Sequence, residues 1–304
     1  MLRLTLPVLA GFAALAAAQQ PAFRDPRLYR SAIALTGVNA TVRDHEGRLV
    51  AGLTRDAFDI YDDGVLQPIA QFTNERVPVS LGVLLDVSDS MFGRRFKDAR
   101  AAVERFLFEL LSDEDEYFVM AFNHRPFPLT TWTDTPDLVR RAMDDVRPSG
   151  GTAVYDAVIA SLPMFLKRVR ERAALVIISD GADTASDASI RSVRASLMRS
   201  EAFVYAVAID SPDRKAINTR VNPISLQEIT DDSGGRTEIV HSSGELPDAT
   251  ARIAGELNSQ YLIGYESPHG DDGRYHTIRV RVRGTDFKVR ARNGYMAPAA
   301  VKSH

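Results

Sequence analysis

Apolar residues in the middle of the chain follow two alternating patterns. Residues 79–85 form a nearly continuous apolar run, which is typical of a strand buried on both faces of a parallel sheet. Between residues 96 and 110 the apolar positions recur every three or four residues, as on the buried face of a helix. The same patterns predict strands at 117–122, 173–179 and 203–209, and helices at 136–146, 153–169, 189–199, 224–230 and 246–257. This alternation predicts an α/β fold with a doubly wound, mostly parallel central sheet flanked by helices.

Both ends of the chain are instead rich in short, strand-like segments with a period of two. Val38, Ala40 and Val42 alternate with polar residues, and the Asp-Gly pair within 62–64 suits the positive φ angles of a tight hairpin. Between 278 and 292, apolar positions alternate with lysine and arginine. Because exposed sheet edges invite aggregation, we expect the two ends to pair as a small antiparallel β accessory unit.

The first 18 residues predict export. Arg3 precedes an apolar run over 4–17, and the alanines at 16–18 fit a small-x-small cleavage site. The run is shorter than the ~20 residues that span a membrane, so we predict a cleaved signal peptide, with an uncleaved signal anchor as the alternative. No segment of the mature chain is apolar enough to span a membrane, and we expect a periplasmic or secreted protein. The predicted parts are a signal peptide (1–18), an N-terminal β segment (19–78), an α/β domain (79–258) and a C-terminal β segment (259–304) that pairs with the N-terminal one.

Composition removes several classes of function. The formal net charge of −3 gives no indication of a nucleic-acid partner. The chain has no cysteine, which excludes disulfides and thiolate metal sites, and the histidines lack ligand spacing such as His-x₃-His, which argues against zinc. There is no Gly-x-Ser-x-Gly elbow and no P-loop lysine, and the second acidic residue of an aspartyl-phosphate site is replaced by Ser88. We therefore expect no enzymatic activity.

Three polar motifs follow predicted strands or open predicted helices, at the sheet edge where α/β proteins bind ligands. They are Asp86-Val87-Ser88-Asp89-Ser90, Ser149-Gly150-Gly151-Thr152 and Ser179-Asp180-Gly181. Any one of them could simply cap a helix, but caps do not explain all three together. Their carboxylates and hydroxyls are hard oxygen donors, which suit Mg²⁺. With only two charged groups among them, a bound ion stays electrophilic and can accept an anionic oxygen from outside.

These motifs resemble the metal-ion-dependent adhesion site of von Willebrand factor type A domains. The resemblance covers about residues 79–257 and implies a ligand set of Asp86, Ser88, Ser90, Thr152 and Asp180. It implies Mg²⁺ as the ion, with Mn²⁺ and Ca²⁺ as alternatives. Phrases in the flanking segments, at 52–54, 61–64 and 292–295, are similar to exported bacterial VWFA-related proteins of the Acidobacteria type.

The favoured hypothesis is an Mg²⁺-dependent protein-binding or adhesion module. Its partner would offer an Asp or Glu carboxylate to the metal-site loops around Ser88, Gly151 and Gly181. The alternative is a structural scaffold of the cell envelope, in which the metal only stabilises the loops and partners bind the β appendages. The arginine-rich face of the C-terminal strands could then attract anions, although an ordinary solvent-exposed face explains it as well.

Overall fold

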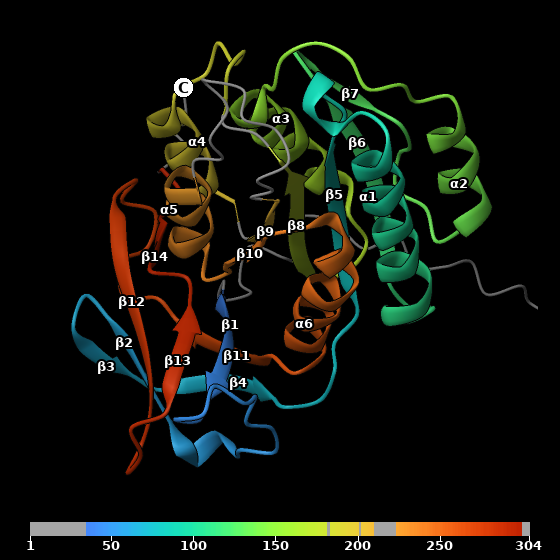
Figure 1. The fold of residues 1–304 in the computed structure, drawn as a ribbon. Helices are drawn as coiled ribbons and strands as arrows, with labels where there is room; N and C mark the ends of the chain where they lie inside the picture. The colour runs from blue at the N-terminus through green and yellow to red at the C-terminus, as the bar shows by residue number, and fades with distance from the viewer. Residues whose placement is uncertain (1–34, 181–182, 201, 210–222, 300–304) are drawn as a thin grey trace, which may run out of the picture. The chain divides into compact units, whose positions relative to one another are not determined.

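A six-stranded sheet forms the centre of the α/β part of the chain (Figure 1). The computed structural model describes residues 35–180, 183–200, 202–209 and 223–299. The strands of this sheet are β5 (Val79–Asp86), β6 (Glu116–Phe122), β7 (Pro126–Pro128), β8 (Arg172–Ser179), β9 (Phe203–Ile209) and β10 (Thr237–Val240). They lie in the order β10-β9-β8-β5-β6-β7, and every neighbouring pair is parallel except β6 and β7. The predicted doubly wound α/β fold is therefore confirmed.

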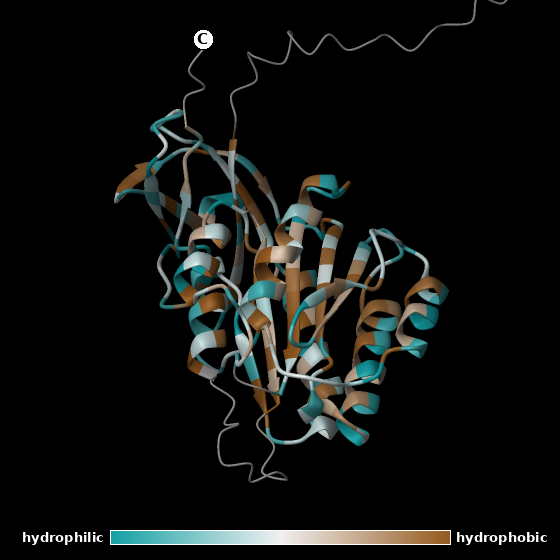
Figure 2. Cartoon of the chain, turned by 90° about the horizontal axis from the view of Figure 1, so that it is seen from above, coloured by the Kyte–Doolittle hydropathy of each residue, from teal (hydrophilic) through white to brown (hydrophobic). Residues whose placement is uncertain are grey.

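Helices cover both faces of this sheet, which explains why its strands are apolar at nearly every position. The helices are α1 (Arg94–Arg105), α2 (Pro136–Asp144), α3 (Val154–Ser161), α4 (Ile190–Leu197), α5 (Pro223–Ser233) and α6 (Leu246–Asn258). Leu81, Val83 and Leu85 of β5 share one apolar cluster with α1, α2 and α6. Leu84 belongs to a second cluster with α3, α4 and α5. Figure 2 shows the result, with apolar strands at the centre and helices that are apolar on one side and polar on the other.

The third predicted helix is shorter than expected. We predicted a helix over 153–169, but α3 ends at Ser161 and a 3₁₀ turn follows over Leu162–Lys167. Pro163 explains the change, because proline cannot donate the helical hydrogen bond and its ring collides with the preceding turn.

Two four-stranded antiparallel sheets combine strands from both ends of the chain. The strands are β1 (Leu35–Arg43), β2 (Phe58–Asp62), β3 (Val65–Gln67), β4 (Ile69–Thr73), β11 (Tyr261–Glu266), β12 (Tyr275–Val282), β13 (Lys288–Ala291) and β14 (Gly294–Met296). One sheet has the order β13-β1-β11-β4 and the other the order β14-β12-β2-β3. The β accessory unit is thus made of N- and C-terminal strands, as predicted, and it has its own apolar core. The domain limits at 78/79 and 258/259 stay a prediction.

Strand β1 is covered on both faces, unlike the half-buried strand that its period-two pattern predicts. Asn39 and Thr41 are buried together with the apolar residues between them. On that same side of the strand, the Arg43 guanidinium contacts the Glu256 carboxylate of α6. The polar face of β1 therefore lies against the α/β part of the chain and is withdrawn from water.

The hairpin between β2 and β3 has the predicted tight turn. Asp63 has φ 45° and Gly64 has φ 81°, the pair of positive angles that a two-residue type I′ turn requires. Asp62 and Val65 face each other across the turn, so the register places both aspartates at the tip of the hairpin.

Two predictions concern residues outside the described ranges, namely the signal peptide at 1–18 and the loop position Gly181. Within the described ranges, no helix combines the length and the apolar character needed to cross a membrane.

Candidate metal centre

The first and third sequence motifs lie side by side at the carboxyl edge of the central sheet. Strands β5 and β8 are parallel neighbours with Leu85 opposite Ile178. The residues that follow, Asp86 and Ser179, are the last of their strands and therefore lie at the same edge of the sheet. This edge is where open α/β sheets place their ligands.

A network of hydrogen bonds joins four of the predicted ligands there. The Ser88 and Ser90 hydroxyls are 2.9 Å apart, and Ser90 Oγ donates to Asp180 Oδ1 at 2.6 Å. The Ser88 amide donates to Asp86 Oδ1 at 2.8 Å, and Ser179 Oγ donates to Asp86 Oδ2 at 2.5 Å. Four of the predicted ligands, Asp86, Ser88, Ser90 and Asp180, are thus brought together in one network.

The Gly-rich motif is tied to the same place through its backbone. The Ser149 amide donates to the Val87 carbonyl at 2.8 Å, and the Asp89 amide donates to the Gly150 carbonyl at 2.9 Å. Gly150 has φ 79°, and a Cβ at this position would lie 2.9 Å from the His124 ring. Only glycine fits here without strain, which accounts for this part of the motif.

Thr152 is the predicted ligand with the weakest connection to the network. It is buried at the start of α3, where its amide donates to the Thr184 hydroxyl at 3.0 Å. The structure therefore places Thr152 on a loop that is bonded to the Asp86 loop, not within the chain of hydrogen bonds itself.

Burial gives Asp86 unusual electrostatics. Its side chain is fully withdrawn from water, and this burial raises the pKa of Asp86 from 3.8 to about 7. Hydrogen bonds from Ser179 and Ser88 act in the opposite direction, and the nearby Asp180 carboxylate adds to the rise. The protein alone therefore stabilises the ionised form of Asp86 poorly.

Arg95 is a member of this site that sequence reasoning missed. Its Nη1 atom lies 2.6 Å from Asp180 Oδ2, and the Asp180 side chain is fully buried while that of Arg95 is 17% exposed. Arg95 stands in the first turn of α1, five residues after Ser90, where a basic side chain can reach back over the loop. No motif marks it, because the contact depends on how α1 lies relative to Asp180, the residue that follows β8.

The donor set fits a hard divalent cation. All the candidate ligand atoms are carboxylate or hydroxyl oxygens, which is the chemistry that Mg²⁺ prefers. The two carboxylates match the charge of one such ion, and Asp86 gains the positive charge that it lacks. Arg95 already neutralises part of Asp180, so it would share this carboxylate with the ion.

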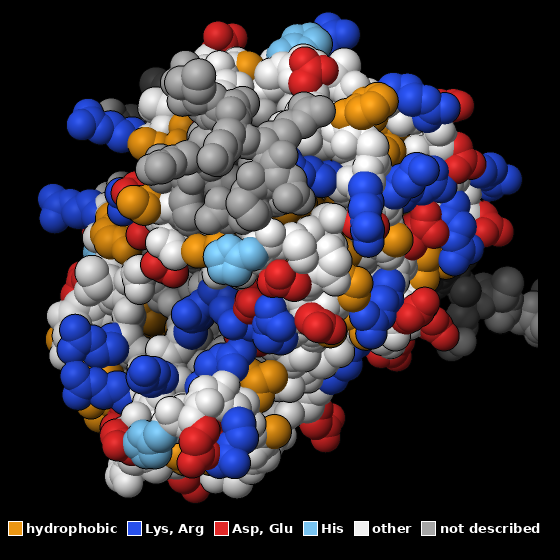
Figure 3. Space-filling view, in the orientation of Figure 1, with side chains coloured by type: hydrophobic (Ala, Val, Ile, Leu, Met, Phe, Trp, Pro, Cys, Tyr) orange, Lys and Arg blue, Asp and Glu red, His pale blue; other side chains and the backbone are white. Residues whose placement is uncertain are grey.

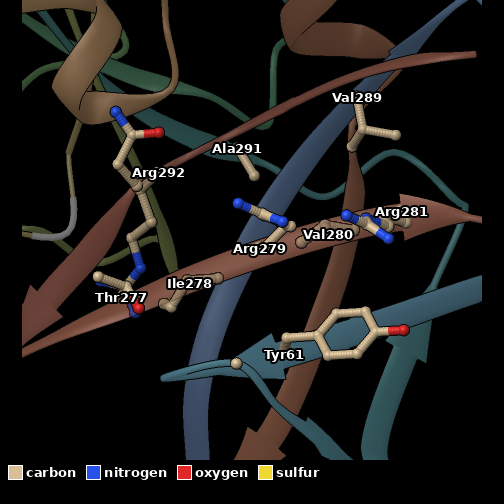
Figure 4. Close-up of a pocket in the computed structure, with 11 residues that line it drawn as sticks. Tyr61, Thr277, Ile278, Arg279, Val280, Arg281, Val289, Ala291 and Arg292 are labelled. Carbon is tan, nitrogen blue, oxygen red and sulfur yellow. The ribbon is translucent and has the colours of Figure 1, made fainter.

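A second feature lies on the arginine-rich face of the β unit. Lys and Arg side chains gather over β12 and β13 in Figure 3, and a groove of about 690 Å³ lies beneath them. In Figure 4, Arg279 and Arg281 stand side by side on β12, between Tyr61 of β2 and Val289 of β13. The Arg281 guanidinium is 5.7 Å from the centre of the Tyr61 ring, a cation–π distance.

Comparison with known proteins agrees with the fold. The family model for the von Willebrand factor type A domain matches residues 81–182, which include all the predicted metal ligands. The inter-alpha-trypsin inhibitor heavy chain H2 of Mus musculus is 26% identical over 141 residues, or 41% of this chain. The chain covers only 14% of that relative. This chain therefore contains a von Willebrand factor type A domain.

Solved structures support the same fold. A von Willebrand factor type A protein from Catenulispora acidiphila superposes with a TM-score of 0.53 at 12% identity, over 90% of this chain and 76% of its own. Proximal thread matrix protein 1 from the mussel byssus gives 0.52 at 14% identity, over 65% of this chain and 51% of its own. At these identities the likeness concerns the fold alone.

Proposed function

We propose that this protein is an Mg²⁺-dependent protein-binding module that captures a carboxylate of its partner at the sheet edge. The observation that carries the proposal is the hydrogen-bonded network that links Asp86, Ser88, Ser90 and Asp180. These side chains would hold the ion together with Thr152. The adjoining surface for the partner would be the loops around Ser88, Gly151 and Gly181.

Charge balance supports a carboxylate on the partner. Two ionised aspartates cancel one Mg²⁺, and the Arg95 guanidinium adds one further positive charge at 2.6 Å from Asp180. The loaded site is then net positive, and it lies at the edge of the sheet where open α/β folds place their ligands. The bound ion would supply an electrophilic position that takes an oxygen ligand. This binding role requires no chemical reaction of the surrounding groups. Mn²⁺ and Ca²⁺ remain alternative ions.

The relatives favour an interaction role. Domains of the von Willebrand factor type A class are typically non-catalytic interaction modules, and one structural neighbour is a matrix protein of the mussel byssus. We extend this role to the present chain. Together with the signal-like residues 1–18, it supports a protein that acts outside the cytoplasm, in the periplasm or after secretion.

The test is capture of native partners from the envelope fraction and the culture medium of cells that produce the protein. Immobilised wild type should retain a partner in Mg²⁺ and lose it in a chelator. The double variant Ser88→Ala/Ser90→Ala should lose it even in Mg²⁺. Retention of the same partner by this variant in the presence of chelator would contradict the proposal.

The groove under Arg279 and Arg281 supports the second candidate, a scaffold that binds through its β unit. Here the metal would only stabilise the loops. Arg279→Ala/Arg281→Ala is the matched double variant for the same capture experiment. It should leave Mg²⁺-dependent capture unchanged if the sheet edge binds the partner, and should abolish capture if the scaffold hypothesis holds.

A further inference from the structure

Four side chains with metal-binding atoms meet at the tip of the β2–β3 hairpin, far along the chain from the sheet-edge motifs. They are Asp62, Asp63, His269 and His276, and one ligand atom from each lies within 4.8 Å of the others. Asp62 ends β2, and Asp63 occupies the following turn. His269 lies between β11 and β12, and His276 is the second residue of β12. Three separate segments thus contribute to one cluster.

Two atoms of the cluster are buried without a hydrogen-bond partner. Asp62 Oδ1 belongs to a fully buried side chain, and it faces His269 Nε2 at 3.2 Å. Neither atom makes a hydrogen bond, although each is closed off from water. Buried polar atoms are normally satisfied, so this pair points to a group that both of them could contact. A cation between a carboxylate oxygen and an imidazole nitrogen would satisfy both.

The remaining atoms of the two buried ligands are already held in place. Asp62 Oδ2 accepts hydrogen bonds from the Tyr265 hydroxyl at 2.8 Å and the Tyr295 hydroxyl at 3.0 Å. His276 Nε2 contacts the Asp272 carboxylate at 3.1 Å, which leaves His276 Nδ1 directed at Asp63 Oδ2, 2.8 Å away. A carboxylate on the second ring nitrogen is the usual support of a metal-binding histidine.

Asp63 is similarly held in place by the residue that follows His276. Asp63 Oδ1 accepts from the Thr277 amide at 2.8 Å and from the Thr277 hydroxyl at 3.0 Å. The His269 ring is stacked on His276, with centroids 3.6 Å apart and planes 9° from parallel.

We propose that Asp62, Asp63, His269 and His276 form a second metal site, specific for a borderline transition-metal cation such as Zn²⁺. The ligand atoms are Asp62 Oδ1, Asp63 Oδ2, His269 Nε2 and His276 Nδ1. Imidazole nitrogen is a ligand that Zn²⁺ takes readily and Mg²⁺ does not, and four protein ligands make a closed, structural type of site. The two carboxylates balance the charge of a bound divalent ion and the two neutral imidazoles add none, so the loaded site has no net charge.

Such an ion would connect the two antiparallel sheets. Strands β2 and β12 belong to one sheet, whereas β11, which leads into the His269 segment and carries Tyr265, belongs to the other. The site therefore fastens the hairpin tip to the β11–β12 connection and stabilises the β unit independently of the sheet-edge site.

The experiment is a calorimetric titration of the chelator-treated full chain with Zn²⁺ alone, followed by Co²⁺ as a spectroscopic substitute. We expect one Zn²⁺ per chain at this cluster and a Co²⁺ spectrum of a four-coordinate ion with nitrogen and oxygen ligands. His269→Ala should weaken Zn²⁺ binding at least a hundredfold. We choose this variant because the His269 side chain is 25% exposed and its removal is the least disruptive to the core.

Asp272→Asn tests the support of His276 without removing a ligand, and should weaken binding about ten- to a hundredfold. His241→Ala, an exposed histidine outside the cluster, is the matched control and should bind Zn²⁺ like wild type. Unfolding of each metal-free variant verifies that it is folded. Unchanged Zn²⁺ affinity in both His269→Ala and Asp272→Asn would overturn the proposal, as would loss of Zn²⁺ binding in Asp86→Ala instead.

Discussion

The buried carboxylates of the two candidate metal sites have opposite environments. At the sheet edge, burial raises the pKa of Asp86 to about 7, so its ionised form is costly in the protein alone. At the hairpin tip, two tyrosine hydroxyls donate to the fully buried Asp62, and they depend on it as their acceptor. We infer that the buried, ionised Asp86 is unfavourable for the fold unless a cation is bound. Asp62, in contrast, stabilises the residues around it even without a cation.

Removing each carboxylate in turn should give the largest contrast. In chelator at pH 8, Asp62→Ala should lower the free energy of unfolding by about 3–6 kcal/mol, because it removes the acceptor of two hydrogen bonds and such bonds to charged groups contribute about 1.5–3 kcal/mol each. Asp86→Ala should cost less than half as much, because it also removes a carboxylate that is unfavourably buried. Urea denaturation measures both values, and equal losses would remove the distinction between the sites.

Mg²⁺ should act on one site only. At one hundred times its dissociation constant, a ligand that binds only the native state stabilises it by about 2.7 kcal/mol. We expect this gain in wild type and in His269→Ala, but not in Asp86→Ala. Thermal unfolding across an Mg²⁺ titration provides the measurement. An identical response of wild type and Asp86→Ala would reject the sheet-edge assignment.

The stability of the metal-free chain should also fall as pH rises, and Asp86 should be the reason. Its pKa is about 7 in the folded state against an ordinary 3.8, so the native state binds more protons than the unfolded state between these values. Its contribution is complete below about pH 4 and is lost as pH rises through 7. Asp86→Asn should flatten the profile between pH 5 and pH 8, and saturating Mg²⁺ should oppose the loss in wild type. A slope unchanged in Asp86→Asn would assign the effect to other groups.

The sheet and the grouping of oxygen-bearing side chains at its edge were predictable because their signals are local. A continuous apolar run over 79–85 marks a strand covered on both faces, and Asp86, Ser88 and Ser90 follow it within one short motif. Parallel strands bring their carboxyl ends to one edge, so the Asp180 motif after β8 could be placed near them. Short strands such as β7, β10 and β14 were missed, since three or four residues carry too little pattern.

The Asp/His cluster was not predictable in this way, and neither was Arg95. His276 and Asp63 are 213 residues apart in sequence, and the spacing of His269 and His276 fits no short metal-binding motif. The spacing of the histidines along the sequence therefore argued against a zinc site, although the pairing of β2 with β12 brings these residues close together. Asn39 and Thr41 were misjudged for a related reason, because the period of a strand does not reveal what covers its polar face.

Substitution of Arg95 gives the smallest expected effect. This cationic side chain belongs to the sheet-edge site and not to the cluster at the hairpin tip. With Arg95→Gln, Asp180 loses its cationic partner at 2.6 Å, and Mg²⁺ no longer shares that carboxylate with a guanidinium. Unit charges about 5 Å apart interact by roughly 3 kcal/mol near a protein surface, and solvent reduces this further. We therefore expect Mg²⁺ to bind about tenfold more tightly, a gain of about 1.4 kcal/mol, while Zn²⁺ binding at the hairpin tip stays unchanged.

Partner capture by the same variant should change in the other direction. The loaded site loses its net positive charge, so the attraction for a partner carboxylate weakens even though the ion is held more firmly. Arg94→Gln is the matched control, because its side chain is 89% exposed and its contact with Asp98 lies outside the site. Calorimetry with Mg²⁺ and capture at saturating Mg²⁺ separate the two effects. If Arg95→Gln instead binds Mg²⁺ more weakly than Arg94→Gln, then Arg95 supports the geometry of the ligands and does not compete with the ion.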